Sequence, residues 1–408
     1  MKILMLSSTF PYPPSRGGTE IRTFNLLKYL SQRHSVTLVT QTQAHTPEAD
    51  VAALRNWVDE LVLFPLPEEP TQGGWIGKVT RLAEVLLKTT PPNVLYRYSP
   101  ALQQWVDDRV RVRQYDVITC EHSVNEAYIR PEFQQTVPTI VDVHSSVYGW
   151  TRNHLEMGAS PNPFRDRLFL PILYRYEKRY CAKFSTIVVT TEDDRLQLQP
   201  FNATAPIEVI PNGVDLDLFP YRSPAKGREL VFVGAMDASH NIDAARFFSL
   251  EVLPQVRQHY PDATFTIVGA RPTPEVEALG ALPGVTVTGQ VPSMVEYLHR
   301  AAVCVVPLRT GYGIKNKTLE AMAAGTPVVA SDRGLEGLAV DSPLRALRAN
   351  RVEDYGTAIG QLFENSELRS QLSQNGRALI EAEYTWERAG QRYEEALEQA
   401  ALRTKQLV

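Results

Sequence analysis

The stretch RTGYGIKNKTLEAMAAGTPVVAS, at residues 309–331, contains a turn, a helix and a strand in direct succession. An apolar run at 303–307 precedes it and predicts a buried strand, and two glycines lie in the following turn. Residues 315–324 predict a helix, and Gly325 is a typical residue at a helix carboxyl end. Residues 326–331 predict the next strand. One βαβ unit of this kind indicates a parallel sheet, because parallel strands need a crossover connection.

The same alternation of short β-branched runs and amphipathic segments continues towards both ends of the chain. It restarts in the second half, so two sheets are expected rather than one. We therefore predict an α/β fold with two Rossmann-like, doubly wound parallel-sheet domains. The predicted strands are Ile3–Leu6, Val36–Thr40, Val117–Thr119, Thr139–Val143, Thr186–Thr190, Leu230–Val233, Phe265–Val268, Val285–Thr288, Val303–Val306 and Val328–Ala330.

The chain has 408 residues, which is long for one core and favours two domains. A segment rich in Pro, Gly and Asn at 211–229 marks a linker between them. We expect a first domain at 1–205 and a second at 206–384. The helical, acidic segment at about 385–408 is expected to pack back on the first domain. If the loops after the strands of the two domains face one another, they form an interdomain cleft for a ligand.

The composition is that of an ordinary globular protein, with 43% hydrophobic residues, 22% charged residues and a net charge of −4. The absence of a basic excess argues against a nucleic-acid partner. The three cysteines are isolated, which excludes a CxxC-type metal site and indicates a reduced, cytoplasmic compartment. The apolar amino-terminal run is short and is interpreted as a strand. No run approaches the roughly 18 apolar residues of a membrane span, so any contact with the inner membrane face is peripheral.

Two lysines and one glutamate in the opening stretch point to a ligand. A helix amino terminus carries partial positive charge, so Lys315 and Lys317 each cost about 0.3–1 kcal/mol there. A bound phosphate or diphosphate would reverse that sign. Alternatively, both lysines point to solvent and the glycines only form a turn. Glu320 lies on an otherwise apolar helix, where it either pairs with Lys317 or accepts hydrogen bonds from sugar hydroxyls.

Further candidate residues follow strands in the first half of the chain. Gly17 and Gly18, in PYPPSRGGTE, follow the first strand at the start of a helix, where they either admit a ligand or only form a turn. Glu121 and His122 follow the third predicted strand, and His144 follows the fourth. These positions are where a doubly wound sheet binds its ligands.

Taken together, the motifs of the second half resemble the retaining glycosyltransferases of family 4, which have the GT-B fold of two Rossmann-like domains. The motifs occur in the family's order, and they are specific in combination. They are VIPNGVDLDLF at 209–219, LVFVGAMDASHNIDAARFF at 230–248, FTIVGA at 265–270, VTVTGQVPSMVEYLHRAAVCVVPL at 285–308 and LEAMAAGTPVVAS at 319–331.

The resemblance implies a nucleotide-sugar site with two departures from the family pattern. Glu320 matches the glutamate that binds the nucleotide ribose, whereas Tyr312 occupies the place of the glutamate that contacts the transferred sugar. The family's Arg and Lys in the loop after the first strand of this domain are replaced by Ala235 and His240 with Asn241. We infer that Lys315 and Lys317, with Arg309, supply the displaced positive charge.

The remaining implied residues complete a donor site and an acceptor side. His122, or Glu121 in a shifted register, would lie near the sugar and the acceptor, together with His144. Gly17 and Gly18 would allow close approach of the donor diphosphate. The other donor-binding residues are the loop residues Gly311, Tyr312, Gly313 and Ile314, the base-flanking Val291, and Gly234 and Leu319.

A metal site is not expected. Asp215 and Asp217 spell DxD, but they follow the linker turn and match PNGVD of the family pattern, and no HExxH or His/Cys cluster occurs. Residues 152–183 hold seven Arg or Lys and three acids, interleaved with aromatic residues. This segment and the amphipathic stretch at 75–88 are either half-buried helices or surfaces for anionic lipid.

The leading hypothesis is a retaining, metal-independent glycosyltransferase that moves a sugar from a nucleotide-diphosphate donor to a hydroxyl acceptor. The acceptor would be a saccharide, a lipid-linked or a small molecule, in polysaccharide or glycoconjugate biosynthesis. Neither a protein nucleophile nor a cofactor is expected. The alternatives are a sugar-nucleotide epimerase of the same fold and a catalytically silent donor-binding subunit of a heteromeric transferase.

Overall fold

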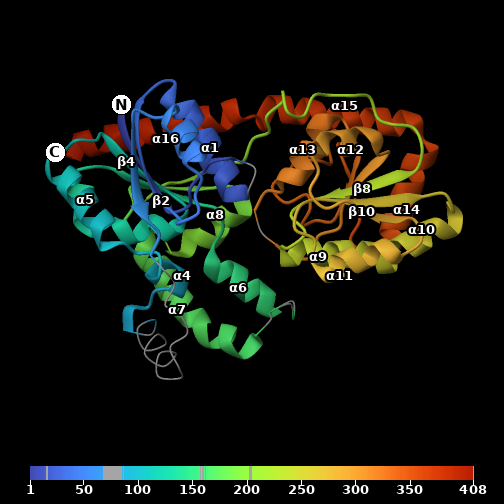
Figure 1. Cartoon of the computed structure of the whole chain (residues 1–408), viewed down its shortest axis with the longest axis horizontal. Coiled ribbons are helices and arrows are strands. Elements are labelled where there is room, and N and C mark those ends of the chain that lie inside the picture. The colour runs from blue at the N-terminus through green and yellow to red at the C-terminus, as the bar shows by residue number, and fades with distance from the viewer. Residues whose placement is uncertain are drawn as a thin grey trace. The chain divides into compact units, whose positions relative to one another are not determined.

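Each half of the chain builds its own parallel sheet in the computed structural model (Figure 1). The structure describes residues 1–14, 17–67, 85, 87–156, 158, 160, 162–201, 205–311 and 313–407. They form two units, Met1–Pro211 with Ala389–Val408, and Asn212–Arg388. We call these unit 1 and unit 2.

Unit 1 contains a seven-stranded sheet in the order β3-β2-β1-β4-β5-β6-β7, with every neighbouring pair parallel. The central strands are apolar runs that are buried on both faces, as expected for a parallel sheet covered by helices. The strands are β1 (Lys2–Ser7), β2 (Ser35–Thr42), β3 (Glu60–Pro65), β4 (Val117–Glu121), β5 (Thr139–Val143), β6 (Thr186–Val189) and β7 (Ile207–Val209).

The helices of unit 1 follow its strands along the chain. They are α1 (Gly18–Ser31), α2 (Glu48–Arg55), α4 (Pro92–Leu95), α5 (Pro100–Arg111), α6 (Val147–Glu156), α7 (Pro163–Cys181) and α8 (Glu192–Leu198), with 3₁₀ turns at Ser123–Tyr128, Pro131–Gln135 and Gln199–Phe201. Helix α16 (Trp386–Leu407) begins in unit 2, and from Ala389 onwards it belongs to unit 1.

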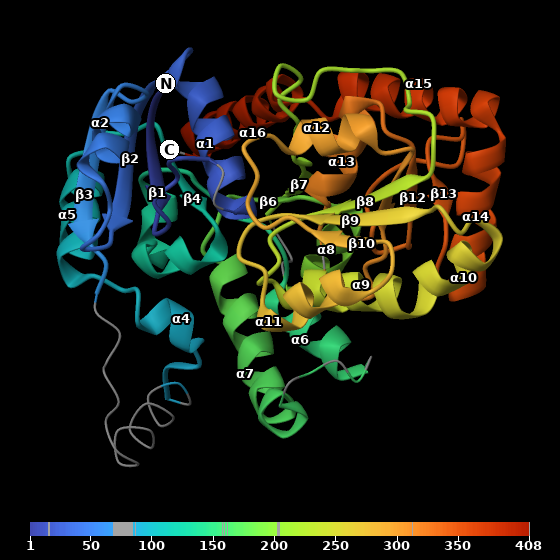
Figure 2. The same ribbon diagram turned by 45° about the vertical axis from the view of Figure 1, so that its right-hand side comes forward.

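Unit 2 contains a six-stranded parallel sheet in the order β10-β9-β8-β11-β12-β13. Figure 2 shows α12 and α13 on one face of this sheet and α9, α10 and α11 on the other. The strands are β8 (Glu229–Val233), β9 (Thr264–Val268), β10 (Val285–Val287), β11 (Val303–Val306), β12 (Val328–Ala330) and β13 (Leu347–Arg348). The helices are α9 (Ser239–Phe247), a π-helical turn (Phe248–Val252), α10 (Leu253–His259), α11 (Pro274–Glu277), a 3₁₀ turn (Ala278–Ala281), α12 (Met294–Arg300), α13 (Asn316–Ala324), α14 (Val352–Glu364) and α15 (Ser366–Glu383).

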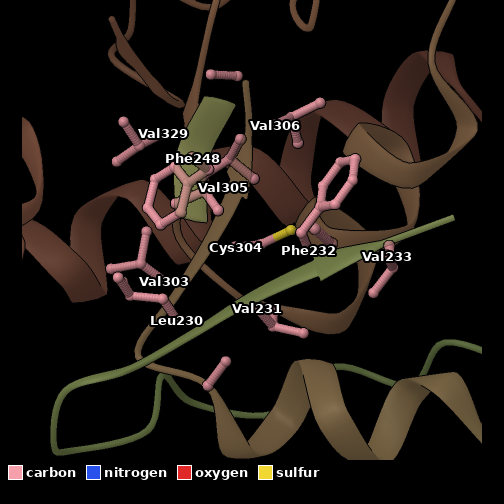
Figure 3. Packing of buried hydrophobic residues seen from close by; sticks show 14 of the residues in the cluster. Leu230, Val231, Phe232, Val233, Phe248, Val303, Cys304, Val305, Val306 and Val329 are labelled. Carbon is pink, nitrogen blue, oxygen red and sulfur yellow. The ribbon is translucent and has the colours of Figure 1, made fainter. Parts of the chain in front are cut away.

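The core of unit 2 is formed by β8 and β11 together with the helices on both faces (Figure 3). Phe232 and Cys304 come from these two strands and are fully buried. Phe248 packs on Phe265 of β9 with 4.5 Å between the ring centroids. This packing holds the ends of β8 and β11 rigidly, and the loops that carry most of the predicted donor residues begin there.

The predicted α/β class and the two parallel sheets are confirmed, but three strands and several bounds were not predicted correctly. The strands missing from the prediction, β3, β7 and β13, each lie at a sheet edge. The helix predicted from Lys315 begins at Asn316, because Lys315 has extended backbone angles and is the N-cap. Glu121 is the last residue of β4 and does not lie in the loop after it.

Candidate active site

Both sheets reverse their strand order at one point, between β1 and β4 in unit 1 and between β8 and β11 in unit 2. The loops after such a pair of strands run to opposite sides and leave a crevice for ligands. In unit 1 these loops carry the predicted Gly17 and His122, and Gly18 is the first residue of α1. In unit 2 they carry Gly234 and the segment at 309–315, and Lys317 lies in the first turn of α13 that follows. The topology therefore places the predicted residues of each unit at its own switch point.

Lys317 lies at the carboxyl end of β8, although it comes from the first turn of α13. Its ammonium group is 4.5 Å from the centroid of the Phe232 ring and donates a hydrogen bond to Oδ1 of Asn241. Asn241 Nδ2 donates in turn to the carbonyl of Ala235 at 2.8 Å. A Cβ atom at Gly234 would lie only 2.8 Å from both Lys317 Nζ and Asn241 Nδ2. Glycine at 234 is therefore required for this arrangement.

Burial shifts the protonation of Lys317 and Glu320 in opposite directions. Loss of hydration lowers the pKa of Lys317 to about 7, against the opposing effect of Glu320. Loss of hydration raises the pKa of Glu320 to about 7, against the opposing effect of Lys317. Within the described part of the chain, the Glu320 carboxylate makes no hydrogen bond. A ligand with an anionic group for Lys317 and hydroxyls for Glu320 would stabilise the charged form of both.

The other two predicted cations bind carboxylates of the protein. Lys315 is 8% exposed and forms an ion pair at 3.2 Å with Glu336, which is also buried. Arg309 is paired with Asp243 and lies over the ring of Phe247 at 4.9 Å. As phosphate ligands both remain predictions, and each would have to share its charge with the carboxylate it already binds.

The loop between β11 and α13 depends on two glycines in left-handed conformations. Gly311 has φ +103° and Gly313 has φ +72°, which other residues rarely adopt. Ile314 is almost fully buried, and Leu319 is fully buried in the core of unit 2. Tyr312 lies outside the described residues. Val291, in the loop after β10, is half-buried and packs against the same core.

In unit 1, a buried ion pair lies next to the ends of β4 and β5. Arg22 of α1 and Asp142 of β5 are joined by two hydrogen bonds, of 2.5 and 3.1 Å, and their side chains are 1% and 0% exposed. Glu121 accepts a hydrogen bond of 2.7 Å from Tyr393 of α16. Burial and the neighbouring Asp142 raise the pKa of Glu121 to about 8, so its carboxyl group is mostly protonated at pH 7.

His122 and His144 form a pair of neutral imidazoles at the carboxyl ends of β4 and β5. Their ring centroids are 5.0 Å apart with the rings nearly perpendicular. Burial lowers the pKa of each to about 3, with His144 adding to the effect on His122 and Arg22 adding to that on His144. His122 Nδ1 accepts from the N–H of Val124 at 3.4 Å, so the ring proton is on Nε2. The backbone of His122 has φ +78°, a strained conformation of the kind found at functional sites.

The two glycines after β1 differ in their surroundings. A Cβ atom at Gly17 would lie 2.8 Å from the Glu20 carboxylate, whereas no atom of the described part of the chain lies within 4 Å of a Cβ position at Gly18. Gly17 is the N-cap of α1, and its carbonyl accepts from the N–H of Ile21 at 3.0 Å. The open space beside Gly18 is compatible with the predicted approach of a diphosphate.

Sequence reasoning missed Arg22, Asp142 and Tyr393. Arg22 lies on the buried face of a helix and Asp142 lies inside a buried apolar strand, which is the signal of a paired charge. Among the described residues, one group could hold a metal ion: His34, Glu394 and Glu398. It is near the amino end of β2, at the other end of the strands from the histidine pair, and His34 and Glu394 already bond each other at 2.7 Å.

Two family models match successive parts of the chain. The model described as Glycosyltransferase Family 4 matches residues 16–218, and the model described as Glycosyl transferases group 1 matches residues 227–365. A curated relative, the phosphatidyl-myo-inositol mannosyltransferase of Mycobacterium tuberculosis, is 34% identical over 132 residues. That match covers 30% of this chain and spans about a third of the relative, 34% of its length.

Solved structures resemble the chain over nearly its whole length. Sucrose-phosphate synthase from Thermosynechococcus elongatus has a TM-score of 0.70 at 20% identity, with 98% of both chains covered. The Anabaena protein HepE in complex with UDP-glucose has a TM-score of 0.62 at 15% identity, with 98% of this chain and 100% of that chain covered. At such low identity these similarities show the GT-B fold alone.

Proposed function

Since the chain belongs to the GT-B glycosyltransferases of the family 4 type, we propose that it transfers a sugar from a nucleotide-diphosphate donor to a hydroxyl acceptor. The acceptor is a saccharide, a lipid-linked or a small molecule in polysaccharide or glycoconjugate biosynthesis. The observation that carries the donor assignment is the placement of Lys317 beside Gly234 and Asn241, with Glu320 one helical turn further on.

In this proposal Lys317 and the free N–H groups at the start of α13 stabilise the leaving diphosphate. The charge that develops on the leaving oxygen is met by fixed protein groups, so the proposal requires no metal ion. Glu320 accepts hydrogen bonds from the ribose hydroxyls. Ionisation of Glu320 and protonation of Lys317 then support each other when the donor is bound.

The acceptor side is assigned to the end of β4 and β5 in unit 1. His122 presents a neutral ring with a proton on Nε2, which can donate a hydrogen bond to a sugar or acceptor oxygen. No protein nucleophile is assigned. The acceptor oxygen attacks the face from which the diphosphate departs, and its proton passes to the leaving diphosphate. The anomeric configuration is then retained.

The test is a panel of UDP-, GDP- and ADP-sugars, each added in excess while thermal unfolding is followed. A donor at 100 times its Kd stabilises the protein by about 2.7 kcal/mol, which raises Tm measurably. Glu320→Ala should remove this shift. Glu296→Ala is a matched control, because Glu296 is an exposed carboxylate on α12 of the same unit. A full shift in Glu320→Ala would contradict the assigned role.

The donor that stabilises the protein is then incubated with candidate acceptors, and the products are separated by chromatography. A glycosylated acceptor and free nucleoside diphosphate support the proposal. An epimerised donor formed without acceptor would show the epimerase instead. Donor binding without turnover in the presence of every acceptor would favour the silent donor-binding subunit.

A further inference from the structure

The outward face of α7 in unit 1 carries basic charge without exposed acidic residues. Arg167, Arg175 and Lys178 are exposed and form no ion pair within the described part of the chain. Both acidic residues of the helix are buried: Asp166 accepts from Ser160 Oγ at 2.7 Å, and Glu177 is 0% exposed. The chain as a whole has a net charge of −4, so this face is opposite in sign to the rest of the molecule.

Large apolar side chains are exposed on the same face. Phe164 is 81% exposed, Leu168 is 53% exposed and Tyr174 is 40% exposed. Phe164, Leu168, Pro171 and Arg175 follow one another at spacings of three or four residues, which places them along one side of a helix. An exposed apolar stripe bordered by long basic side chains is typical of helices that lie at a lipid surface.

The opposite face of α7 fixes the helix to unit 1. Tyr176 and Tyr180 are buried in the core cluster of this unit. Glu177 accepts hydrogen bonds of 2.7 Å from the N–H of Val147 and from Ser146 Oγ at the start of α6. Figures 1 and 2 both show α6 and α7 extending beyond the strands of unit 1. The exposed stripe is therefore presented on a helix that is already folded and anchored.

We propose that the outward face of α7 docks unit 1 onto the surface of an anionic phospholipid bilayer. Phe164 and Leu168 insert at the level of the headgroups, and Arg167, Arg175 and Lys178 bind the lipid phosphates. The attachment is peripheral, since no helix among the described residues is long and apolar enough to cross a bilayer. A bilayer fits better than a protein partner, because the face offers only basic charge around its apolar centre. The proposal is independent of the donor chemistry.

The experiment is co-sedimentation of the full chain with large vesicles of phosphatidylglycerol and phosphatidylcholine, compared with phosphatidylcholine alone. We expect binding only to the anionic vesicles, and weaker binding when salt is raised from about 0.1 to about 0.5 M. Each basic side chain near an anionic surface strengthens binding about fivefold, so the double variant Arg167→Gln/Arg175→Gln should bind about 25-fold more weakly. Phe164→Ser/Leu168→Ser should lose at least about tenfold.

Matched controls distinguish binding through the outward face of α7 from nonspecific electrostatic or hydrophobic binding. Arg55→Gln/Lys226→Gln removes two exposed cations elsewhere, and Leu218→Ser removes an apolar side chain that is 66% exposed. Both controls should bind like the wild type, and thermal unfolding should be unchanged in all variants. Equal binding to neutral vesicles, or equal loss in the controls, would overturn the proposal. A third outcome would also overturn it: the wild type does not bind vesicles and forms a dimer in sedimentation velocity, and Phe164→Ser/Leu168→Ser abolishes this dimer. That result would show that a second copy of the chain binds to this face.

Discussion

Raising the pH from 7 to 8.5 should weaken donor binding about 16-fold through Lys317 alone. With a pKa of about 7 in the free protein, this lysine is about half protonated at pH 7 and about 3% protonated at pH 8.5. A bound diphosphate places negative charge beside the ammonium group and returns its pKa towards the ordinary lysine value of 10.5. Binding then takes up a proton, and the lost affinity corresponds to about 1.6 kcal/mol.

Glu320 should produce the acidic limb of the same dependence of donor affinity on pH. Its pKa of about 7 means that acidification protonates the carboxylate and weakens its hydrogen bonds to the ribose hydroxyls. Affinity should therefore pass through a maximum near pH 7. The nucleotide contributes no charge change of its own here, because a sugar diphosphate diester is fully ionised throughout and the upper limit avoids ionisation of the base.

The assay is isothermal titration calorimetry with the stabilising donor at several pH values, in two buffers of different ionisation enthalpy to count protons. The alkaline limb and the proton uptake should disappear in Lys317→Met, and the acidic limb should disappear in Glu320→Gln. Arg309→Gln serves as a comparison, because that side chain is already neutralised by Asp243. An alkaline limb of unchanged slope in Lys317→Met would refute the reasoning.

Three further predictions concern the same groups and the ion pair of unit 1. Lys317→Met should stabilise the donor-free protein by about 1–3 kcal/mol in urea denaturation, because it removes a desolvated cation. The lowered pKa of Lys317 makes the free energy of unfolding of the wild type rise with pH between about 7 and 10.5. A loss of stability in Lys317→Met would contradict this prediction. Gly234→Ala should reduce donor affinity at least about tenfold while circular dichroism stays unchanged, since its Cβ would displace Lys317 Nζ; wild-type affinity would exclude this steric role. Arg22→Met should cost about 3–5 kcal/mol by leaving Asp142 unpaired, and Arg22→Met/Asp142→Leu should cost much less; equal losses in urea denaturation would show that the charge itself is not the cause.

The central strands could be predicted from sequence because they are buried on both faces. Strands such as β1 and β11 are continuous apolar runs, a signal that does not depend on their neighbours. The edge strands β7 and β13 are only three and two residues long, and β3 is half-exposed. Their pairing depends on the strand beside them, so local composition does not distinguish them from loops.

The candidate site divides in the same way between local and long-range information. Lys317 and Glu320 lie within one helix, and their unusual positions can be recognised in a single stretch of sequence. The bonds from Arg22 to Asp142 and from Tyr393 to Glu121 join residues 120 and 272 positions apart. Periodicity carries no information on such pairs, although a charged residue inside a buried strand signals that a partner must exist.

Lys315 and Lys317 are two residues apart at the same helix start, yet among the described residues only Lys315 has a carboxylate at hydrogen-bonding distance. Glu336 forms an ion pair with Lys315 at 3.2 Å. A buried cation needs such a partner for stability, whether or not a ligand binds. Lys317 instead donates a hydrogen bond to the neutral amide of Asn241. It lies beside Gly234, where a Cβ atom would be only 2.8 Å from Lys317 Nζ. Packing does not require a cation here, because a methionine would fill similar space without the desolvation cost. This is the argument for our proposal that a ligand anion, the diphosphate of the donor, binds at Lys317.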